Sequence, residues 1–206
     1  MERSKYVILF VVLSLSFFVF DYHNILQKHP QTVHQWRQCD GGAIAMHYVH
    51  NKLNPFDPGV YNLHGNGKTV AEFPIIYYVD ACIISIVGYH YRDVVIRMVN
   101  LLIFYLGLLY LFKIGLLVLK RWYWALLPVL FYAACPIVTY YAATSVPNVP
   151  ASAILCIGIF YLLNYLQQKE TKPLFLAIFF VAIAGMIKST VLTPYLAICG
   201  VLFFAL

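Results

Sequence analysis

Charged residues are scarce in this 206-residue chain: 11% of it is Asp, Glu, Lys or Arg, against 62% hydrophobic residues. A soluble domain carries about 25% charged residues, so the sequence lacks the polar surface that a water-soluble protein needs. The same scarcity excludes a disordered chain, a collagen-like chain and a nucleic-acid-binding protein, despite the net charge of +6. The composition therefore predicts an integral membrane protein.

Cysteines are also few, and their positions are unsuited to pairing. The five cysteines are odd in number, and four of them lie inside apolar runs, which fits neither a disulfide framework nor a zinc site. The sequence also lacks an HExxH motif or a similar ligand signature. His47 and His50 lie three residues apart on an expected helix, and we interpret them as surface or headgroup contacts rather than metal ligands.

Apolar runs of nearly membrane-spanning length recur along the chain. A helix needs roughly 20 mostly apolar residues to cross about 30 Å of hydrocarbon, and Trp, Tyr and Lys at the edges of these runs suit an interface. Six spans are expected: residues 6–20, 98–119, 122–143, 149–166, 174–187 and 190–206. Between the first two, the loop of residues 21–72 holds six of the seven histidines and four of the eight acids. The prediction is an all-α polytopic membrane protein.

A seventh apolar run, residues 73–88, decides the topology. It is short and carries Asp80 near its middle, a residue that costs about 2.5–3.5 kcal/mol at the centre of a membrane helix. If this run crossed the membrane, four later cations would face outward: Lys120, Arg121, Lys169 and Lys172. The positive-inside rule favours the opposite arrangement. Residues 73–88 are therefore predicted to form an interfacial or re-entrant helix, with a cytoplasmic N-terminus and the loop of residues 21–72 outside.

Four polar features then fall on the outer side of the membrane: residues 34–42 (HQWRQCDGG), Glu72, residues 145–148 (SVPN) and Lys188. The first of them opens a helical pattern that runs to about Asn51. Inverting sugar transfer from a lipid phosphate needs a general base and groups that hold the departing phosphate. A carboxylate, a helix start and a lysine at one membrane face suit that chemistry, although composition alone does not choose it over other interfacial reactions.

Residues 36–40 (WRQCD) resemble the WRQ-x-D signature in the first outer loop of bacterial membrane glycosyltransferases of the GT-C class, relatives of the protein O-mannosyltransferases and the lipid A aminoarabinose transferase. The resemblance continues in order through further motifs: Asp57-Pro58, Glu72-Phe73-Pro74, Arg97, Pro147-Asn148 and Lys188. It implies a multi-span fold with juxtamembrane helices in the first outer loop. It also implies an inverting transfer from a polyprenyl-phosphate sugar to an unknown hydroxyl acceptor, at the extracytoplasmic face of the inner or plasma membrane.

The same resemblance implies roles for individual residues. Asp40 is similar to the catalytic carboxylate and is expected to be the general base. Substrate-binding roles are expected for Trp36, Arg37, Glu72, Asn148 and Lys188, with Glu72 near the acceptor or the donor phosphate and Lys188 on the phosphate side. Family members commonly have an acid where this chain has Asn148, which weakens the case for a divalent metal, although an amide oxygen can still coordinate one.

Simpler interpretations of these residues stay open. Asp40 precedes two glycines and a helical pattern, so it can be a helix N-cap, and Arg37, one turn earlier, can pair with it. Trp36 can be an interface anchor, and Lys188 can be a side chain that snorkels to lipid phosphates. Asp80 is expected to pair with one of two arginines near the second span, Arg92 or Arg97.

For the chain as a whole, the alternative to an enzyme is a non-catalytic membrane module. Leu206 lies in an apolar run with no polar flank, and members of the resembled class usually continue through several more spans. The chain is therefore expected to be the N-terminal part of a longer protein. A truncated glycosyltransferase fragment, a lipid-phosphate binder and a subunit of a complex all fit this alternative. A transporter is a weaker third option, because no pair of broken spans is evident.

Overall fold

The computed structural model describes residues 2–61 and 72–205, and helices make up most of both segments. In chain order they are α1 (Glu2–Val19), α2 (Tyr22–Ile25), α3 (Gln35–His50), α4 (Ile75–Val87), the 3-10 turn η1 (Tyr89–Tyr91), α5 (Arg92–Leu119), α6 (Trp122–Ala134), α7 (Pro136–Ala142), α8 (Asn148–Gln168), α9 (Thr171–Ile187), the 3-10 turn η2 (Ser189–Val191) and α10 (Leu192–Ala205). These two segments contain no strand. The predicted all-α membrane fold is confirmed.

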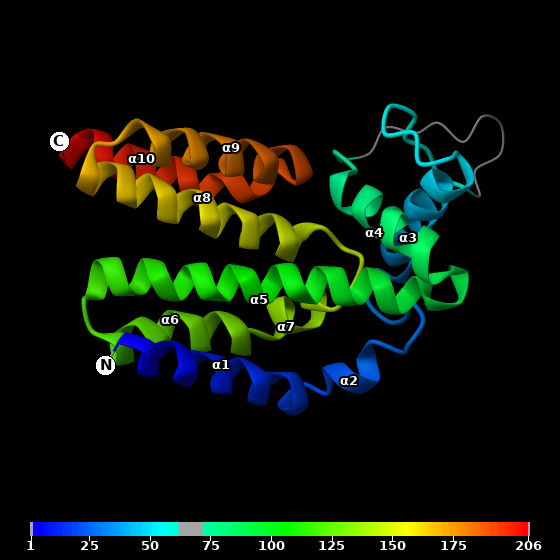
Figure 1. Cartoon of the computed structure of the whole chain (residues 1–206), viewed down its shortest axis with the longest axis horizontal. Coiled ribbons are helices and arrows are strands. Elements are labelled where there is room, and N and C mark those ends of the chain that lie inside the picture. The colour runs from blue at the N-terminus through cyan, green and yellow to red at the C-terminus, as the bar shows by residue number, and fades with distance from the viewer. Residues whose placement is uncertain (1, 62–71, 206) are drawn as a thin grey trace.

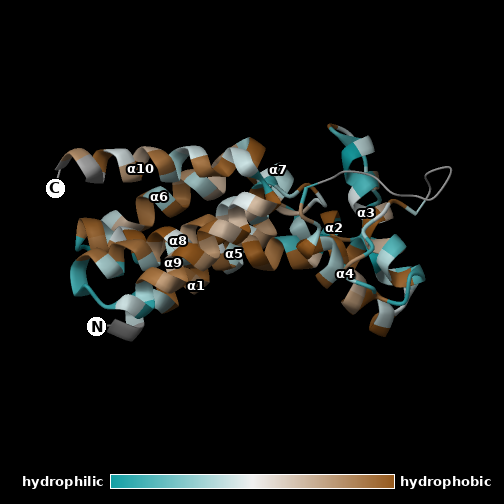
Figure 2. Cartoon of the chain, turned by 90° about the horizontal axis from the view of Figure 1, so that it is seen from above, coloured by the Kyte–Doolittle hydropathy of each residue, from teal (hydrophilic) through white to brown (hydrophobic). Residues whose placement is uncertain are grey.

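The long helices lie roughly parallel in a bundle, and α3 and α4 are grouped at one end of it (Figure 1). Within the bundle, α5 packs against α6 and α8, and α8 packs against α9. Hydrophobic residues run along the bundle helices, whereas hydrophilic residues gather around α3 and its neighbouring connections (Figure 2). Both termini and the α5–α6 and α8–α9 turns lie at the end of the bundle opposite to α3.

Few of the helices are long enough to span a membrane by themselves. Residues 89–119 and α8 are long and apolar enough to cross a membrane, and α6 with α7 is so as a bent pair. Shorter apolar helices cover Ser4–Val19, Thr171–Ile187 and Ser189–Val201. Six membrane crossings therefore stay a prediction, whereas the antiparallel course of the corresponding helices is visible in Figure 1.

The segment expected to be one span, residues 122–143, is not a single straight helix, because the chain breaks there into α6 and α7, bent by 72°. Proline disfavours the α conformation of the residue before it, and Cys135, before Pro136, is extended with φ −65° and ψ 118°. The hydroxyl of Thr139 donates to the carbonyl oxygens of Ala133, at 2.7 Å, and Cys135, at 3.0 Å. These bonds partly replace the helical hydrogen bonds lost at the break.

Small residues let the bundle helices approach closely. A Cβ atom added at Gly107 of α5 would lie 2.5 Å from the Cβ of Ala153 of α8, and one added at Gly115 would lie 2.9 Å from the Cβ of Ala125 of α6. Close contact between small residues is how helices commonly associate in a membrane, where lipid tails are as apolar as Leu side chains.

The helix α4 lies beside α3 rather than along the bundle (Figure 1). Its 13 residues extend about 20 Å at 1.5 Å per residue, short of the roughly 30 Å of hydrocarbon. Buried apolar side chains join it to α3 and to the first turns of α5: Ile44, Tyr48, Tyr77, Ile84 and Ile96. Its interfacial position stays a prediction, and this packing puts the start of α4 close to the end of α9.

Candidate active site

The signature residues 36–40 lie inside the first two turns of α3. This helix begins at Gln35, after His34 in the left-handed conformation with φ 55°. Asp40 is therefore an interior helix residue, and the alternative that it caps the helix N-terminus is wrong. The two glycines that suggested a cap are helical as well, since α3 continues to His50.

Gly41 fixes α3 against two other elements. A Cβ atom at Gly41 would lie 2.9 Å from the Cβ of Ser145 and 2.9 Å from Cε1 of Tyr77. The hydroxyl of Ser145 donates to the carbonyl oxygen of Gln38 at 2.7 Å, and the hydroxyl of Tyr77 donates to the carbonyl oxygen of Ser145 at 3.2 Å. The helices α3 and α4 and the α7–α8 loop thus meet beside Asp40 and hold its backbone in place.

Three of the expected site residues form a charge cluster. Oε1 of Glu72 accepts hydrogen bonds from Nη2 of Arg37 and from Nζ of Lys188, the latter at 2.5 Å. Arg37 belongs to α3, Glu72 precedes α4, and Lys188 follows α9. One carboxylate between two cations leaves the Arg37–Glu72–Lys188 cluster with a net charge of +1, and all three side chains are only partly buried.

A backbone contact supports this cluster. The N–H of Phe73 donates to the carbonyl oxygen of Met186 at 3.2 Å. The residue after Glu72 is thereby joined to the last turn of α9, two residues before Lys188. The ion pair between Glu72 and Lys188 thus lies next to a main-chain contact between the same two segments.

Asp40 lies one helical turn after Arg37 and is half-buried. Its carboxylate makes no hydrogen bond or ion pair with any residue in 2–61 or 72–205. Arg37 pairs with Glu72 instead, so the suggested pairing of Arg37 with Asp40 is wrong. A carboxylate without a partner among these residues can accept a proton from a neighbouring group.

Tyr77 of α4 lies close to the charges of the cluster. Burial raises the pKa of the Tyr77 hydroxyl, the negative charge of Glu72 raises it further, and the positive charge of Arg37 opposes this. The carboxyl groups of Asp80 and Asp40 also raise this pKa. Tyr77 therefore stays protonated and keeps donating its hydrogen bond to Ser145.

The two remaining substrate-binding candidates are not part of the cluster. Trp36 is 63% exposed on the first turn of α3, and Asn148 is an exposed residue at the start of α8. In the described parts of the chain, neither side chain has a hydrogen bond or ring contact. Their expected contacts with substrate stay predictions.

A metal site does not form from these residues. Within residues 2–61 and 72–205, no three His, Cys, Asp or Glu side chains lie close enough together to hold a metal ion. Asn148, the residue on which the family resemblance would place a metal ligand, has no acidic side chain bonded to it in those segments. The donor set that a divalent cation needs is therefore not assembled in this part of the chain.

The expected pairing of Asp80 with Arg92 or Arg97 is wrong. Arg92 pairs with Asp93, and buried Arg97 donates to the carbonyl oxygens of Lys28, Ala143 and His29 at 3.0, 2.6 and 3.1 Å. Arg97 thus ties the segment after α2 and the end of α7 to α5. Both carboxyl oxygens of Asp80 are buried without a partner among the described residues, and burial raises the pKa of Asp80 well above its usual value.

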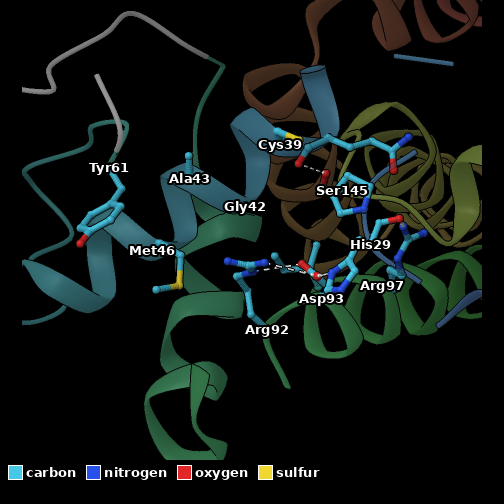
Figure 3. A pocket seen from close by; sticks show the side chains of 13 residues that line it. His29, Cys39, Gly42, Ala43, Met46, Tyr61, Arg92, Asp93, Arg97 and Ser145 are labelled. Carbon is cyan, nitrogen blue, oxygen red and sulfur yellow. Dashed lines mark hydrogen bonds and ion pairs between the residues drawn. The ribbon is translucent and has the colours of Figure 1, made fainter. Parts of the chain in front are cut away.

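A cavity of about 420 Å³ lies on another side of α3 (Figure 3). Its walls include Tyr61, Arg92 and Asp93, together with His29 and Cys39. Of these residues only Cys39 lies in the signature, and no sequence pattern points to Tyr61, Asp93 or this cavity. The only available signal was the concentration of polar residues in the first outer loop.

The comparison with known families bears on this arrangement. A family model described as dolichyl-phosphate-mannose-protein mannosyltransferase matches residues 71–206. The chain belongs to this family. The match confirms the resemblance to membrane glycosyltransferases and includes Glu72, Arg97, Asn148 and Lys188, whereas α3 with Asp40 lies before it. No curated protein and no solved structure gives a significant match to the chain.

The unpartnered Asp80 generates a prediction about stability. An unfolded chain releases the Asp80 proton at a pH of about 3.9, whereas the folded protein keeps it to a higher pH. The free energy of unfolding should therefore fall as the pH rises above about 4. In Asp80→Asn this fall is removed, so at pH 8 the variant should be more stable than the wild type by about 1.4 kcal/mol for each unit of pKa elevation.

Thermal unfolding of the detergent-purified protein from pH 4 to pH 8 checks this. Asp21→Asn, at an exposed acid, is the matched control and should follow the wild type. Parallel pH profiles for the wild type and Asp80→Asn would contradict the expected protonated state of Asp80.

Proposed function

We propose that this protein transfers a sugar from a polyprenyl-phosphate-linked donor to a hydroxyl acceptor, with inversion at the anomeric carbon. One observation carries the proposal: Asp40, a carboxylate with no partner among residues 2–61 and 72–205, lies one helical turn from Arg37 of the Arg37–Glu72–Lys188 cluster, at one end of a bundle of apolar helices. Membership of a mannosyltransferase family supports transfer from a lipid-linked donor. The site residues and the mechanism below are part of the proposal.

In this proposal Asp40 is the general base. The acceptor hydroxyl oxygen attacks the anomeric carbon, and the bond from that carbon to the phosphate oxygen breaks, with its electron pair leaving on the phosphate. Asp40 takes the hydroxyl proton as the new glycosidic bond forms. Its lack of a hydrogen bond or ion pair in the described segments leaves its carboxylate available for that proton.

Arg37 and Lys188 are proposed to hold the phosphate that leaves. Arg has five N–H donors and Lys has three, so both keep free donors while they are bonded to Glu72. Negative charge grows on the departing phosphate, and fixed cations stabilise that charge most in the transition state. Glu72 keeps the two cations together and reduces their mutual repulsion.

The exposed candidates complete the proposed substrate contacts. Trp36, on the first turn of α3, is proposed to contact membrane lipids or the donor sugar, since an indole suits the headgroup region. Asn148 is proposed to contact a substrate hydroxyl through its exposed amide. The N-terminus is proposed to be cytoplasmic, because Lys120, Arg121, Lys169 and Lys172 are in or next to turns at the N-terminal end of the bundle.

A second candidate function uses the same cluster without catalysis. A non-catalytic membrane module that binds lipid phosphates would also need two cations at headgroup depth, and the +1 charge of the cluster suits that role. The two functions differ in whether Asp40 is needed for anything beyond binding, so a variant at Asp40 separates them.

Asp40→Asn should therefore lower the rate of sugar transfer by about 10²–10⁴-fold, the usual contribution of a general base. Expression, membrane insertion and binding of the donor should stay at wild-type levels, because the Asp40 side chain bonds to none of the residues that the structure describes. The measurement is transfer from a radiolabelled polyprenyl-phosphate sugar by membranes that contain the full natural protein, with Asp21→Asn as the control. Wild-type turnover by Asp40→Asn would remove Asp40 from the mechanism.

Lys188→Ala, in contrast to Asp40→Asn, should weaken binding of the donor. A hydrogen bond to a charged group contributes about 1.5–3 kcal/mol, so the KM for the donor should rise roughly ten- to hundred-fold. Lys169→Ala, at the opposite end of the bundle, is the matched control and should leave the KM unchanged. An unchanged donor KM in Lys188→Ala would exclude the proposed contact between Lys188 and the phosphate.

A further inference from the structure

The cavity beside α3 has the size of a small-molecule site. Its volume of about 420 Å³ lies within the roughly 300–1,000 Å³ of ligand pockets. Five α3 residues form one wall: Gln38, Cys39, Gly42, Ala43 and Met46. Figure 3 shows Tyr61 on one side of this wall, with Arg92, Asp93 and His29 on the other. The cavity thus has an aromatic side and a polar side.

Tyr61, the ring on the aromatic side, belongs to a stack of three rings. The imidazole of His50 lies between two tyrosines, with ring centroids 4.3 Å from Tyr61 and 5.7 Å from Tyr89, and both pairs are nearly parallel. The backbone N–H of Tyr61 donates to the carbonyl oxygen of Ala43 at 3.2 Å. The Tyr61 ring is therefore held in place at the cavity while 55% of the residue stays exposed.

The polar side is built around Asp93. Its carboxylate contacts Nδ1 of His29 at 2.6 Å and accepts from Nε of Arg92 at 3.0 Å. His29 and Arg92 are both exposed beyond these contacts. Remaining ring and guanidinium nitrogens can therefore bond to a ligand while Asp93 keeps the two side chains oriented.

This combination is the chemistry that recognises a sugar ring. The C–H face of a saccharide carries partial positive charge and packs on the negative face of an aromatic ring. Its hydroxyl groups pair with planar side chains such as carboxylate, guanidinium and imidazole. A serine or threonine side chain of a protein acceptor has no such ring face and would leave the aromatic side of the cavity unused.

Asp40 lies between this cavity and the charge cluster. At 100° per residue, Arg37 and Ala43 are each three residues from Asp40, so they project about 60° to either side of it. Arg37 belongs to the cluster and Ala43 lines the cavity. A donor phosphate at Arg37 and an acceptor in the cavity would therefore approach Asp40 from opposite sides.

We infer that the cavity is the acceptor site and that the acceptor hydroxyl belongs to a saccharide, stacked on Tyr61 and hydrogen-bonded at the Arg92–Asp93–His29 side. The assignment of the cavity as the acceptor site rests on the proposed function. Binding of a saccharide in the cavity depends only on the cavity itself, so the two can fail separately.

A glycan array tests the inference without requiring turnover. The full chain in lipid nanodiscs is applied to an array that carries bacterial and eukaryotic surface glycans together with Ser/Thr-rich peptides. We expect the wild type to bind a subset of the glycans and none of the peptides. Tyr61→Ala should weaken that binding at least tenfold, and Tyr61→Phe, which keeps the ring, should retain it. Phe56→Ala, at an aromatic residue that is 92% exposed, is the matched control and should bind like the wild type.

The native Cys39 offers a second measurement that needs no variant. Its thiol is exposed and lines the cavity, so the glycan that binds most strongly on the array should slow alkylation of Cys39 by a maleimide. The inference would be overturned if the wild type bound no glycan or bound peptides alone. It would also be overturned if Tyr61→Ala bound as well as the wild type, or if the glycan left Cys39 unprotected. Full transfer by Asp40→Asn would overturn the proposed mechanism and leave saccharide binding unaffected.

Discussion

The shared carboxylate of Glu72 is the interaction on which this site depends. It joins Arg37 of α3 to Lys188 after α9, residues 151 positions apart in the sequence. The contact requires α4 to start beside the end of α9, and the backbone bond from Phe73 to Met186 meets the same requirement. If α4 crossed the bilayer, its start and the end of α9 could not share this place. The position of α4, the cluster and the orientation of α3 are therefore consequences of one arrangement.

The packing at Gly41 extends this arrangement to Asp40. The matched family region begins just before Glu72. Asp40 therefore lies outside this region in the sequence, and only tertiary contacts of α3 connect the two. Gly41 touches both Tyr77 of α4 and Ser145 of the α7–α8 loop, and both of those residues lie inside the matched region. A side chain at position 41 would push α3 away from them. The helix α3, which carries the signature, thus packs against the region that matches the family.

Part of this structure was predictable from the sequence, because hydropathy and charge determine it locally. Apolar runs with few charges predict helices, and helices form there. The downstream cations predict that residues 73–88 stay at one side of the membrane, and the contact between Glu72 and Lys188 is compatible with that prediction. The break before Pro136 also has a local cause, and proline chemistry could have predicted it. The partners of Asp80 and Arg97 had no such signal, since Arg97 bonds to backbone carbonyl groups that carry no residue-specific pattern. The cavity joins His29, Tyr61 and Asp93, and only the tertiary packing of α3 on α5 brings them near each other.

The central claim is that Asp40 and Lys188 face the same side of the membrane, outside the cell, while the α8–α9 turn faces the cytoplasm. Site-directed labelling with a membrane-impermeant maleimide tests it most directly, with Lys188→Cys and Lys169→Cys introduced singly beside the native Cys39. The account predicts that Cys39 and the cysteine at position 188 react in intact cells or spheroplasts, and that the cysteine at position 169 reacts only after the membrane is permeabilised. Reaction at position 188 only after permeabilisation, with Cys39 reacting from outside, would contradict it.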